Sequence, residues 1–489
     1  MAFSLVRLSL RHIALGLGLI VLGPNAALLA QSGEPSSTSA TRDNPAVLAG
    51  KAWLAANKMT DDAGFLAALH DLWPTAPGTN EQVFASRELF RSLEFKAVGK
   101  TGPDSAELWL FDPDQDGYVI ATVKVRADDP EKVAGIRVIP TADLPPGVAA
   151  QAPLTEPALI AAVRDRAQVA ATAGRFDGAV LIARKGHVLF QHAYGLADRA
   201  ARKPDTVDTQ FRFGSMGKMF TAVAIMQLIE AGKVDPSAPI GRYLPGYANR
   251  EIATKVTVAN LLTHTGGTGD IFGPDFMSHR AELRDPADYV ALYQNRGPLF
   301  EPGRRIAYSN YGFMLLGRIV ETVSGRRYDD YVAQHIWGPA GMHSTGNQPE
   351  TVVLPRRAVA YTGPTGKLDR ADDTLPYRGT PAGGGYSTVG DFARFADALV
   401  NGKLMKPATL DALIHGGIKL TDGTFAAYDF GGTIPGKGRF IGHNGGAPGM
   451  SGQLVHFLGS GYTLVVLANR DPPAGAGILS FAVHRLPAR

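Results

Sequence analysis

The sequence has no cysteine and only a small excess of positive charge, and each of these features excludes certain functions. Without cysteine there is no disulfide framework, no thiolate nucleophile and no thiolate metal site. The formal net charge is +4 at pH 7, and two positive charges, Arg7 and Arg11, belong to an N-terminal leader without acidic residues. The remaining excess is too small to indicate binding to nucleic acid or to an anionic membrane surface. We therefore expect a small-molecule or peptide substrate and no nucleic-acid partner.

After the first thirty residues, no segment is apolar enough to cross a bilayer. Arg7 and Arg11 precede an apolar core, residues 13–22, and Ala27–Ala30 offers a small-residue cleavage point. This order is typical of a cleavable secretory signal peptide, here residues 1–30. It predicts a periplasmic or secreted protein with no membrane span after signal removal, and an uncleaved anchor is the alternative.

The motifs of several other enzyme and metal-binding classes are absent. Ser215 does not sit in a Gly-x-Ser-x-Gly elbow, because position 213 is Phe, which argues against an α/β-hydrolase. No His-Glu-x-x-His zinc motif is present, and the run Gly383–Gly385 lacks the Lys-Ser/Thr ending of a phosphate loop. The stretch 112–117 copies the first half of a calcium loop, but its twelfth position is Val123, where such a loop needs glutamate. We interpret it as a hairpin turn and expect neither a metal nor a cofactor.

The length of 489 residues favours two domains over one. Residues 31–44 form a polar, small-residue tether that we predict to be disordered. A small α+β module without an assigned role follows at 45–140. The Pro-rich linker 141–157 then separates it from the larger domain, 158–489.

Apolar periodicity predicts the elements of both domains. In the small module these are helices at 61–73 and 81–93 and strands at 106–111, 118–125 and 133–139. The larger domain is predicted to begin with a helix at 158–173 and strands at 178–183 and 187–193. It is predicted to end with strands at 452–457 and 462–467 and a helix at 477–486. Strands at both ends of the domain and helices in its middle suggest one antiparallel sheet to which both ends contribute, flanked by helices. This is a mixed α/β (α+β) fold with a helical subdomain.

The stretch Phe211–Lys218 carries the strongest candidate nucleophile. Ser215 precedes residues 219–229, which are apolar on nearly every side and predict a helix buried on all faces. Lys218 follows Ser215 by three residues, which places both side chains on one face of the helix. A serine hydroxyl needs a neighbouring base, and a lysine can serve only if burial or a nearby positive charge lowers its pKa. On spacing alone, a helix-capping serine beside a solvated lysine is the alternative.

Two more stretches complete a pattern. The motifs in chain order are Ser215-x-x-Lys218, Tyr308-x-Asn310 and His443-x-Gly445. Together they resemble the penicillin-recognising serine hydrolases, in particular the class C β-lactamase-like branch. The resemblance covers about residues 158–489 and leaves the N-terminal module outside it. It implies a β-lactamase/transpeptidase-like fold for the larger domain.

The second and third motifs each occur more than once. Tyr-x-Asn is also found at 247/249 and 293/295, and His-x-Gly at 264/266 and 415/417. We choose Tyr308 because a Pro-Gly-Arg-Arg stretch precedes it and an apolar helix follows it. We choose His443 because it lies just before the C-terminal strand pair. His264, within Leu-Leu-Thr-His-Thr, is interpreted as structural, and His415 as part of a Gly-rich turn.

The resemblance implies a role for each motif residue. Ser215 attacks a carbonyl and forms an acyl-enzyme, while Lys218 and Tyr308 exchange the proton, and which of these two is the general base stays open. Asn310 hydrogen-bonds the substrate's amide or the lysine. The backbone N–H groups of Ser215 and Gly446 hold the oxyanion. The substrate-binding and oxyanion residues are thus Asn310, His443, Gly445 and Gly446.

One departure from the pattern bears on the substrate. The triplet begins with His443 rather than lysine, and a histidine is mostly neutral near pH 7. This favours a periplasmic serine hydrolase for a small ester, amide or D-amino-acid peptide, with peptidoglycan fragments among the candidate partners. β-Lactamase or DD-peptidase activity is the alternative. A non-catalytic binding or scaffold relative is the alternative of another class.

Overall fold

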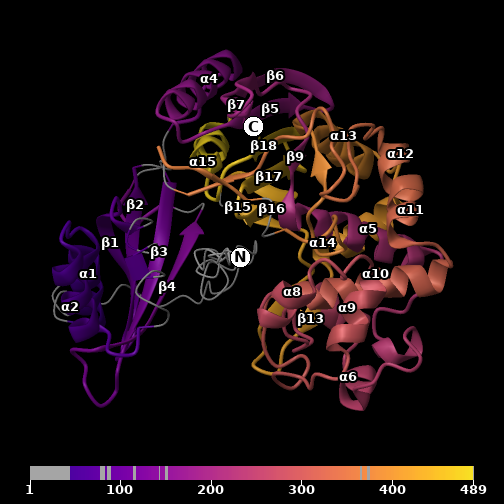
Figure 1. The fold of residues 1–489 in the computed structure, drawn as a ribbon, viewed down its shortest axis with the longest axis horizontal. Coiled ribbons are helices and arrows are strands. Elements are labelled where there is room, and N and C mark those ends of the chain that lie inside the picture. The colour runs from indigo at the N-terminus through magenta and orange to yellow at the C-terminus, as the bar shows by residue number, and fades with distance from the viewer. Residues whose placement is uncertain are drawn as a thin grey trace, which may run out of the picture. The chain divides into compact units, whose positions relative to one another are not determined.

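The computed structural model describes residues 44–487, apart from 77–82, 85–86, 88–89, 114–116, 142–143, 149–151, 364–365, 372–374 and 435 (Figure 1). The predicted signal peptide, nearly all of the predicted tether and the centre of the turn at 112–117 lie outside these residues. The chain divides into two compact units, with the boundary between Ala150 and Gln151. Each unit is described by itself.

The N-terminal unit is a four-stranded antiparallel sheet with helices on one face. Its elements are α1 (Pro45–Asn57), α2 (Asp62–Leu72), β1 (Glu94–Thr101), β2 (Ser105–Asp112), β3 (Gly117–Val125) and β4 (Val133–Thr141), with the strands in sequence order. Leu108 and Leu110 of β2 are fully buried with Val123 of β3 beneath α1, because alternate residues of a strand face one side. Gly50 permits this packing, since a Cβ there would lie 2.0 Å from Leu108 Cδ1.

The structure confirms the predicted helix at 61–73 and all three predicted strands of this unit. Sequence analysis missed α1 and β1. The helix α1 is rich in alanine, so its apolar face is weakly marked. Its start is well defined, because Pro45 lies in the first turn and the Asn44 side chain accepts a hydrogen bond from the Ala46 N–H at 2.9 Å. The predicted helix at 81–93 lies partly outside the described residues.

The second unit is built on a six-stranded antiparallel sheet, in the order β15-β16-β17-β18-β5-β6. The strands are β5 (Gly178–Arg184), β6 (His187–Tyr194), β15 (Gly431–Ile434), β16 (Gly438–Ala447), β17 (Met450–Phe457) and β18 (Tyr462–Ala468). The pairing of β18 with β5 joins the two ends of the unit, as predicted. Lys185 and Gly186 both have positive φ, 51° and 80°, which gives the β5–β6 hairpin a turn whose twist matches its strands.

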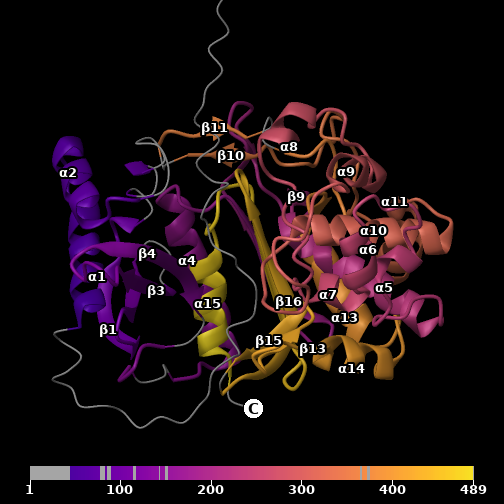
Figure 2. The same cartoon turned by 90° about the horizontal axis from the view of Figure 1, so that it is seen from below.

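Helices cover both faces of this sheet (Figure 2). The helices α4 (Glu156–Thr172) and α15 (Ala476–Arg485) pack on the face that carries Val180 and Val466. On the other face Leu181 and Val465 join the larger core with α13 (Val389–Val400). Central strands buried on both faces read as continuous apolar runs, as β5 and β18 do.

The helical layer contains most of the remaining elements. Its helices are α5 (Lys218–Glu230), α6 (Arg250–Lys255), α7 (Val258–Leu262), α8 (Pro274–His279), α9 (Pro286–Tyr293), α10 (Asn310–Ser324), α11 (Tyr328–Val332), α12 (Gly338–Ala340) and α14 (Pro407–His415). The short strands are β7 (Leu196–Asp198), β8 (Lys203–Pro204), β9 (Phe211–Arg212), β10 (Tyr361–Thr362), β11 (Asp369–Arg370), β12 (Tyr386–Ser387), β13 (Gly417–Lys419) and β14 (Phe425–Ala427). Over the described part of the chain, every helix is too short or too polar to span a bilayer.

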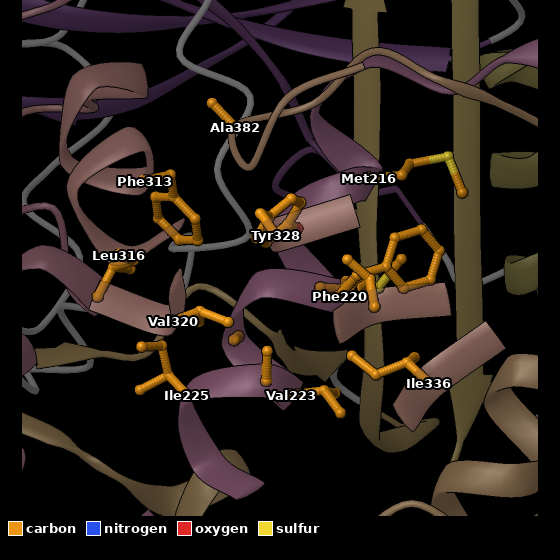
Figure 3. Packing of buried hydrophobic residues seen from close by; sticks show 14 of the residues in the cluster. Met216, Phe220, Val223, Ile225, Phe313, Leu316, Val320, Tyr328, Ile336 and Ala382 are labelled. Atoms are coloured by element: carbon orange, nitrogen blue, oxygen red, sulfur yellow. The ribbon is translucent and has the colours of Figure 1, made fainter. Parts of the chain in front are cut away.

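The helix α5 lies in the middle of this layer. Figure 3 shows its Phe220, Val223 and Ile225 among side chains of α10 such as Leu316 and Val320. Only Gln227, Ile229 and Glu230 of this helix are more than slightly exposed, which confirms the prediction of a helix buried on nearly all faces. A helix enclosed in this way holds its first turn rigidly, and Ser215 lies just before that turn.

Candidate active site

Ser215 lies in a short 3₁₀ turn, Gly214–Gly217, that leads directly into α5. In a 3₁₀ turn residues i and i+3 eclipse each other, so Lys218 stands directly over Ser215. The Lys218 Nζ atom lies 3.2 Å from Ser215 Oγ, as the spacing predicts. Gly214 is needed at the start of the turn, because its φ is +53° and a Cβ there would lie 2.8 Å from the Gly446 nitrogen.

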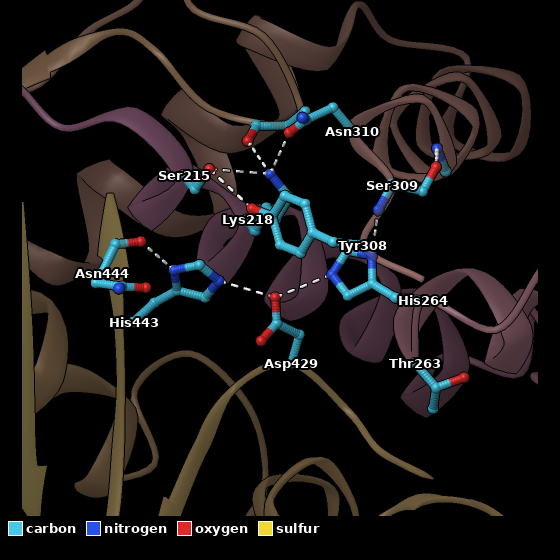
Figure 4. A network of polar contacts seen from close by, with 12 residues as sticks. Ser215, Lys218, Thr263, His264, Tyr308, Ser309, Asn310, Asp429, His443 and Asn444 are labelled. Carbon is cyan, nitrogen blue, oxygen red and sulfur yellow. Dashed lines mark hydrogen bonds and ion pairs between the residues drawn. The ribbon is translucent and has the colours of Figure 1, made fainter. Parts of the chain in front are cut away.

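Lys218 is fully buried and has two other partners (Figure 4). It donates to Asn310 Oδ1 at 2.7 Å and to the Ala382 carbonyl at 2.5 Å. Burial lowers the Lys218 pKa to about 7, although the charges of Asp429 and Asp270 act in the opposite direction. A neutral amine has two N–H donors and one lone pair. With both donors used, the lone pair of the neutral lysine faces the serine hydroxyl.

Tyr308 is the second neighbour of the nucleophile. Its hydroxyl donates to Ser215 Oγ at 2.8 Å, and its ring lies 4.7 Å from Lys218 Nζ. Burial raises the Tyr308 pKa well above its usual value, so the phenol keeps its proton at neutral pH. Tyr308 is held just before α10, whose N-cap, Ser309, accepts from the Gly312 N–H at 2.8 Å.

Asn310 makes one of the two contacts that the resemblance implies, the contact with the lysine. Its Nδ2 donates to both carboxylate oxygens of Asp270, at 3.0 and 3.1 Å, which fixes its Oδ1 toward Lys218. Sequence analysis missed Asp270. It stands in a Gly-rich loop forty residues before Asn310, and no local spacing connects the two.

The strand β16 passes close beside Ser215. A Cβ on Gly445 would lie 2.9 Å from the Ser215 nitrogen and 2.0 Å from the Phe213 carbonyl, so only glycine fits. The Gly446 nitrogen lies against Gly214 on the same side. The first N–H groups of a helical turn lack an intrahelical acceptor. The structure therefore places the Gly445–Gly446 segment of β16 directly beside the turn that carries Ser215.

His443 needs a correction. We expected its ring beside the substrate, but the side chain is fully buried and turned inward, with Nε2 2.8 Å from Asp429 Oδ2. Its Nδ1 contacts the carbonyl of Asn444 (Figure 4). Residues 441–443 of β16 are buried, and the His443 ring faces Asp429 in the interior.

His264 and Asp429 complete the polar cluster below the tyrosine. His264 Nε2 lies 3.0 Å from Asp429 Oδ2, its Nδ1 accepts from the Ser309 N–H at 3.0 Å, and its ring lies 4.4 Å from that of Tyr308. The interpretation of His264 as structural was therefore incomplete, because it contacts a site residue. Asp429 was missed, since it lies in a loop without a motif. Within the described residues, no group of three or more His, Asp or Glu side chains is arranged to hold a metal ion.

The rejected motif copies lie elsewhere. The Tyr247 hydroxyl is 3.0 Å from that of Tyr311, and Tyr293 donates to the Ile271 carbonyl at 2.8 Å. His415 lies at the exposed end of α14, 2.9 Å from Asp411. Neither of these hydroxyls is hydrogen-bonded to Ser215, which favours the choice of Tyr308.

A serine whose hydroxyl lies between a buried lysine and a buried tyrosine, under a mixed sheet-and-helix fold, is the arrangement of a serine hydrolase. The family comparison agrees, because the model described as Beta-lactamase matches residues 160–486. The chain thus belongs to the beta-lactamase family, with the fold that the resemblance predicted. It is a serine hydrolase of that family.

Named relatives differ in their activities. Penicillin-binding protein 4* of Bacillus subtilis is 30% identical over 335 residues, which cover 64% of this chain and 72% of the relative. Esterase EstB of Burkholderia gladioli is 33% identical over 198 residues, covering 37% of this chain and 50% of EstB. Among solved structures, a D-stereospecific amidohydrolase from Streptomyces sp. has a TM-score of 0.55 at 26% identity and covers 65% of this chain and 97% of its own.

Proposed function

We propose that the protein is an exported serine hydrolase that forms an acyl-enzyme on Ser215 and acts on a small ester, amide or D-amino-acid peptide. One observation carries the proposal: Ser215 Oγ lies within hydrogen-bond reach of both Lys218 Nζ and Tyr308 Oη. This is the geometry that an activated serine requires. The leader-like first thirty residues support export.

In this proposal the lysine is the general base. A Lys218 pKa of about 7 leaves a free amine at neutral pH, whereas Tyr308 stays protonated. As Ser215 Oγ bonds to the substrate carbonyl carbon, its proton passes to Lys218 Nζ. The oxyanion that forms is held by the amides of Ser215 and Gly446.

The second half of acylation returns the proton. When the bond between carbonyl carbon and leaving group breaks, Tyr308 Oη donates a proton to the departing alkoxide or amine and is reprotonated from Lys218. A water then attacks the acyl-enzyme carbonyl and gives one proton to the same pair. As the bond between the carbonyl carbon and Ser215 Oγ breaks, that proton passes to Oγ and the carboxylic acid leaves. Asn310 and the Ala382 carbonyl keep the lysine nitrogen on the serine throughout.

The inward-facing His443 supports the choice of substrate class. With its ring against Asp429, this position offers no free cation to a substrate carboxylate, as a lysine of the triplet would. Esters and amides without a carboxylate need none. The names of EstB and of the Streptomyces amidohydrolase support the same classes.

β-Lactam or D-alanyl-peptide recognition is the second candidate, supported by the likeness to penicillin-binding protein 4* over 64% of the chain. A chromogenic cephalosporin separates the candidates. Turnover comparable to that of an aryl ester would favour β-lactamase. Slow acylation of Ser215 without turnover would favour a penicillin-binding role.

The acyl-enzyme itself is tested by intact-mass spectrometry after treatment with a fluorophosphonate, on the wild type and on Ser215→Ala. We expect one adduct on the wild type and none on the variant. If the folded wild type takes no adduct even from a small sulfonyl fluoride, Ser215 is not activated and the non-catalytic alternative holds.

A further inference from the structure

Asp429 lies below the proposed site as a buried carboxylate shared by two imidazoles. Its side chain is 4% exposed, and one oxygen, Oδ2, faces His264 Nε2 at 3.0 Å and His443 Nε2 at 2.8 Å. Figure 4 shows the carboxylate between the two rings. A buried charge is costly unless it is paired, so this cluster has a role that outweighs its desolvation. The proposed acylation steps do not use it.

The two histidines hold opposite sides of the nucleophile. His264 contacts the segment around Tyr308 at three points, because its carbonyl accepts from the Ala307 N–H at 2.8 Å, its ring packs on the tyrosine ring and its Nδ1 accepts from Ser309. His443 belongs to β16, two residues before Gly445, which lies against the Ser215 amide. Asp429 therefore connects the tyrosine to the strand that carries the oxyanion amide.

The hydrogen-bond partners of His264 indicate where its proton lies. The Ser309 N–H points at His264 Nδ1, so this nitrogen has the lone pair and the proton of a neutral ring sits on Nε2, facing the carboxylate. His443 faces two acceptors, the Asn444 carbonyl at Nδ1 and Asp429 at Nε2. One ring nitrogen of each histidine therefore faces the same oxygen of Asp429.

We propose that Asp429, through His264 and His443, is a positioning residue that holds Tyr308 and the Gly445–Gly446 segment in register around Ser215. It touches neither the substrate nor the reacting atoms. The inference rests on the proposed function, because it assigns these residues to the same site.

The carboxylate also acts on the lysine through space. The charged and titratable groups around Lys218 are Asp270, Tyr308, His264, Asp429 and His443. Asp429 and Asp270 raise the Lys218 pKa against the larger effect of burial. Loss of the Asp429 charge therefore lowers this pKa, and the acid limb of the rate profile moves to lower pH.

The test compares Asp429→Asn with the wild type in full-length protein, with p-nitrophenyl acetate as substrate and kcat and KM measured from pH 5.5 to 9. We expect kcat to fall at least tenfold with KM within threefold, and the acid limb to move to lower pH. Asp391→Asn is the matched control, since Asp391 is equally buried and bonds Ser344 and Thr345 away from the site. A folded Asp429→Asn protein with the wild-type kcat and the wild-type limb overturns the proposal.

A second measurement needs no variant of Asp429. Long-range ¹H–¹⁵N spectra of histidine-labelled wild type, assigned with His264→Asn and His443→Gln, report the protons on each ring. We expect Nε2 of His264 and Nε2 of His443 each to carry a proton that faces Asp429. A lone pair on His443 Nε2 overturns the network. If Ser215→Ala hydrolyses the ester as fast as the wild type, the proposed function fails, while these spectra still decide the network.

Discussion

At the scale of single residues, the nucleophile lies between two neighbours whose pKa values burial moves in opposite directions, down for Lys218 and up for Tyr308. The same loss of water that frees the Lys218 amine keeps the Tyr308 phenol protonated, because burial always disfavours the charged form. One environment thus prepares a base and an acid on either side of Ser215. The three side chains need no external group to share a proton.

This division predicts the pH profile of the enzyme and of Tyr308→Phe. Because the base must be unprotonated, kcat/KM should rise with pH through an apparent pKa of about 7 and then level off. Removing the phenol proton should lower kcat on the order of 10²-fold while leaving the acid limb in place. Steady-state kinetics on an aryl ester checks both. A limb that disappears in Tyr308→Phe would make the tyrosine the titrating base.

Lys218 should also govern stability, and Lys218→Met isolates the effect. The lysine is fully buried, and its pKa is about 10.4 when unfolded but about 7 when folded. Between these values only the unfolded chain holds the extra proton. The wild-type free energy of unfolding should therefore rise with pH by up to about 1.4 kcal/mol per unit. Because methionine does not titrate, Lys218→Met should lack this contribution to the pH dependence.

The measurement is urea unfolding of both proteins at pH 6, 7.5 and 9. Taken as variant minus wild type, the stability difference should be constant below pH 7 and fall above it. A difference that stays constant across the whole range would mean that Lys218 is charged in the folded protein.

At the scale of elements, the site depends on β16 and the 3₁₀ turn meeting backbone to backbone. Gly445→Ala should separate them, because the added methyl would overlap the Phe213 carbonyl and crowd the Ser215 amide. We expect kcat/KM to fall about 10²-fold or more, the usual cost of losing an oxyanion donor. Gly297→Ala, where a methyl meets nothing within 4 Å, is the control and should keep full activity. Equal activities of the two variants would place the oxyanion elsewhere.

The parts of the site that sequence analysis predicted are those with a local pattern. Ser215 and Lys218 share one helical turn, and Tyr308 and Asn310 flank one N-cap, so short spacing places them. Asp270 and Asp429 act across tertiary contacts that no spacing encodes. The prediction that His443 binds substrate did not foresee its inward orientation for the same reason, since packing decides which way a ring faces.

Some elements also had weak local signals. The edge strand β1 mixes charged, small and apolar residues without a regular alternation, and every position is at least partly exposed, so it lacks an apolar face to detect. The helix α13 has Thr388 as its N-cap, but a capping box with Asp391 is only half formed. Thr388 accepts from the Asp391 N–H at 3.1 Å, while the Asp391 carboxylate bonds Ser344 and Thr345 instead.

At the scale of the whole molecule, the two units have separate hydrophobic cores, one beneath α1 and one around α5 and the six-stranded sheet. We expect calorimetry to resolve two unfolding transitions. With about 0.7 kcal/mol per residue, their enthalpies should be near 70 and 240 kcal/mol. A single transition whose calorimetric and van't Hoff enthalpies agree would show that the units unfold as one.

The pairing of β18 with β5 also has a consequence in time. Gly178 lies beside Ala468, so β5 and β18 cannot pair until almost the whole chain is available. Such distant partners make sheet closure slow, because a long loop must be ordered before its contacts are gained. The strand β16, which carries Gly445 and Gly446, is held beside Ser215 by its place in that sheet. An unfinished chain, still leaving the ribosome or crossing a membrane, would therefore carry its nucleophile without an oxyanion site and remain harmless to its surroundings.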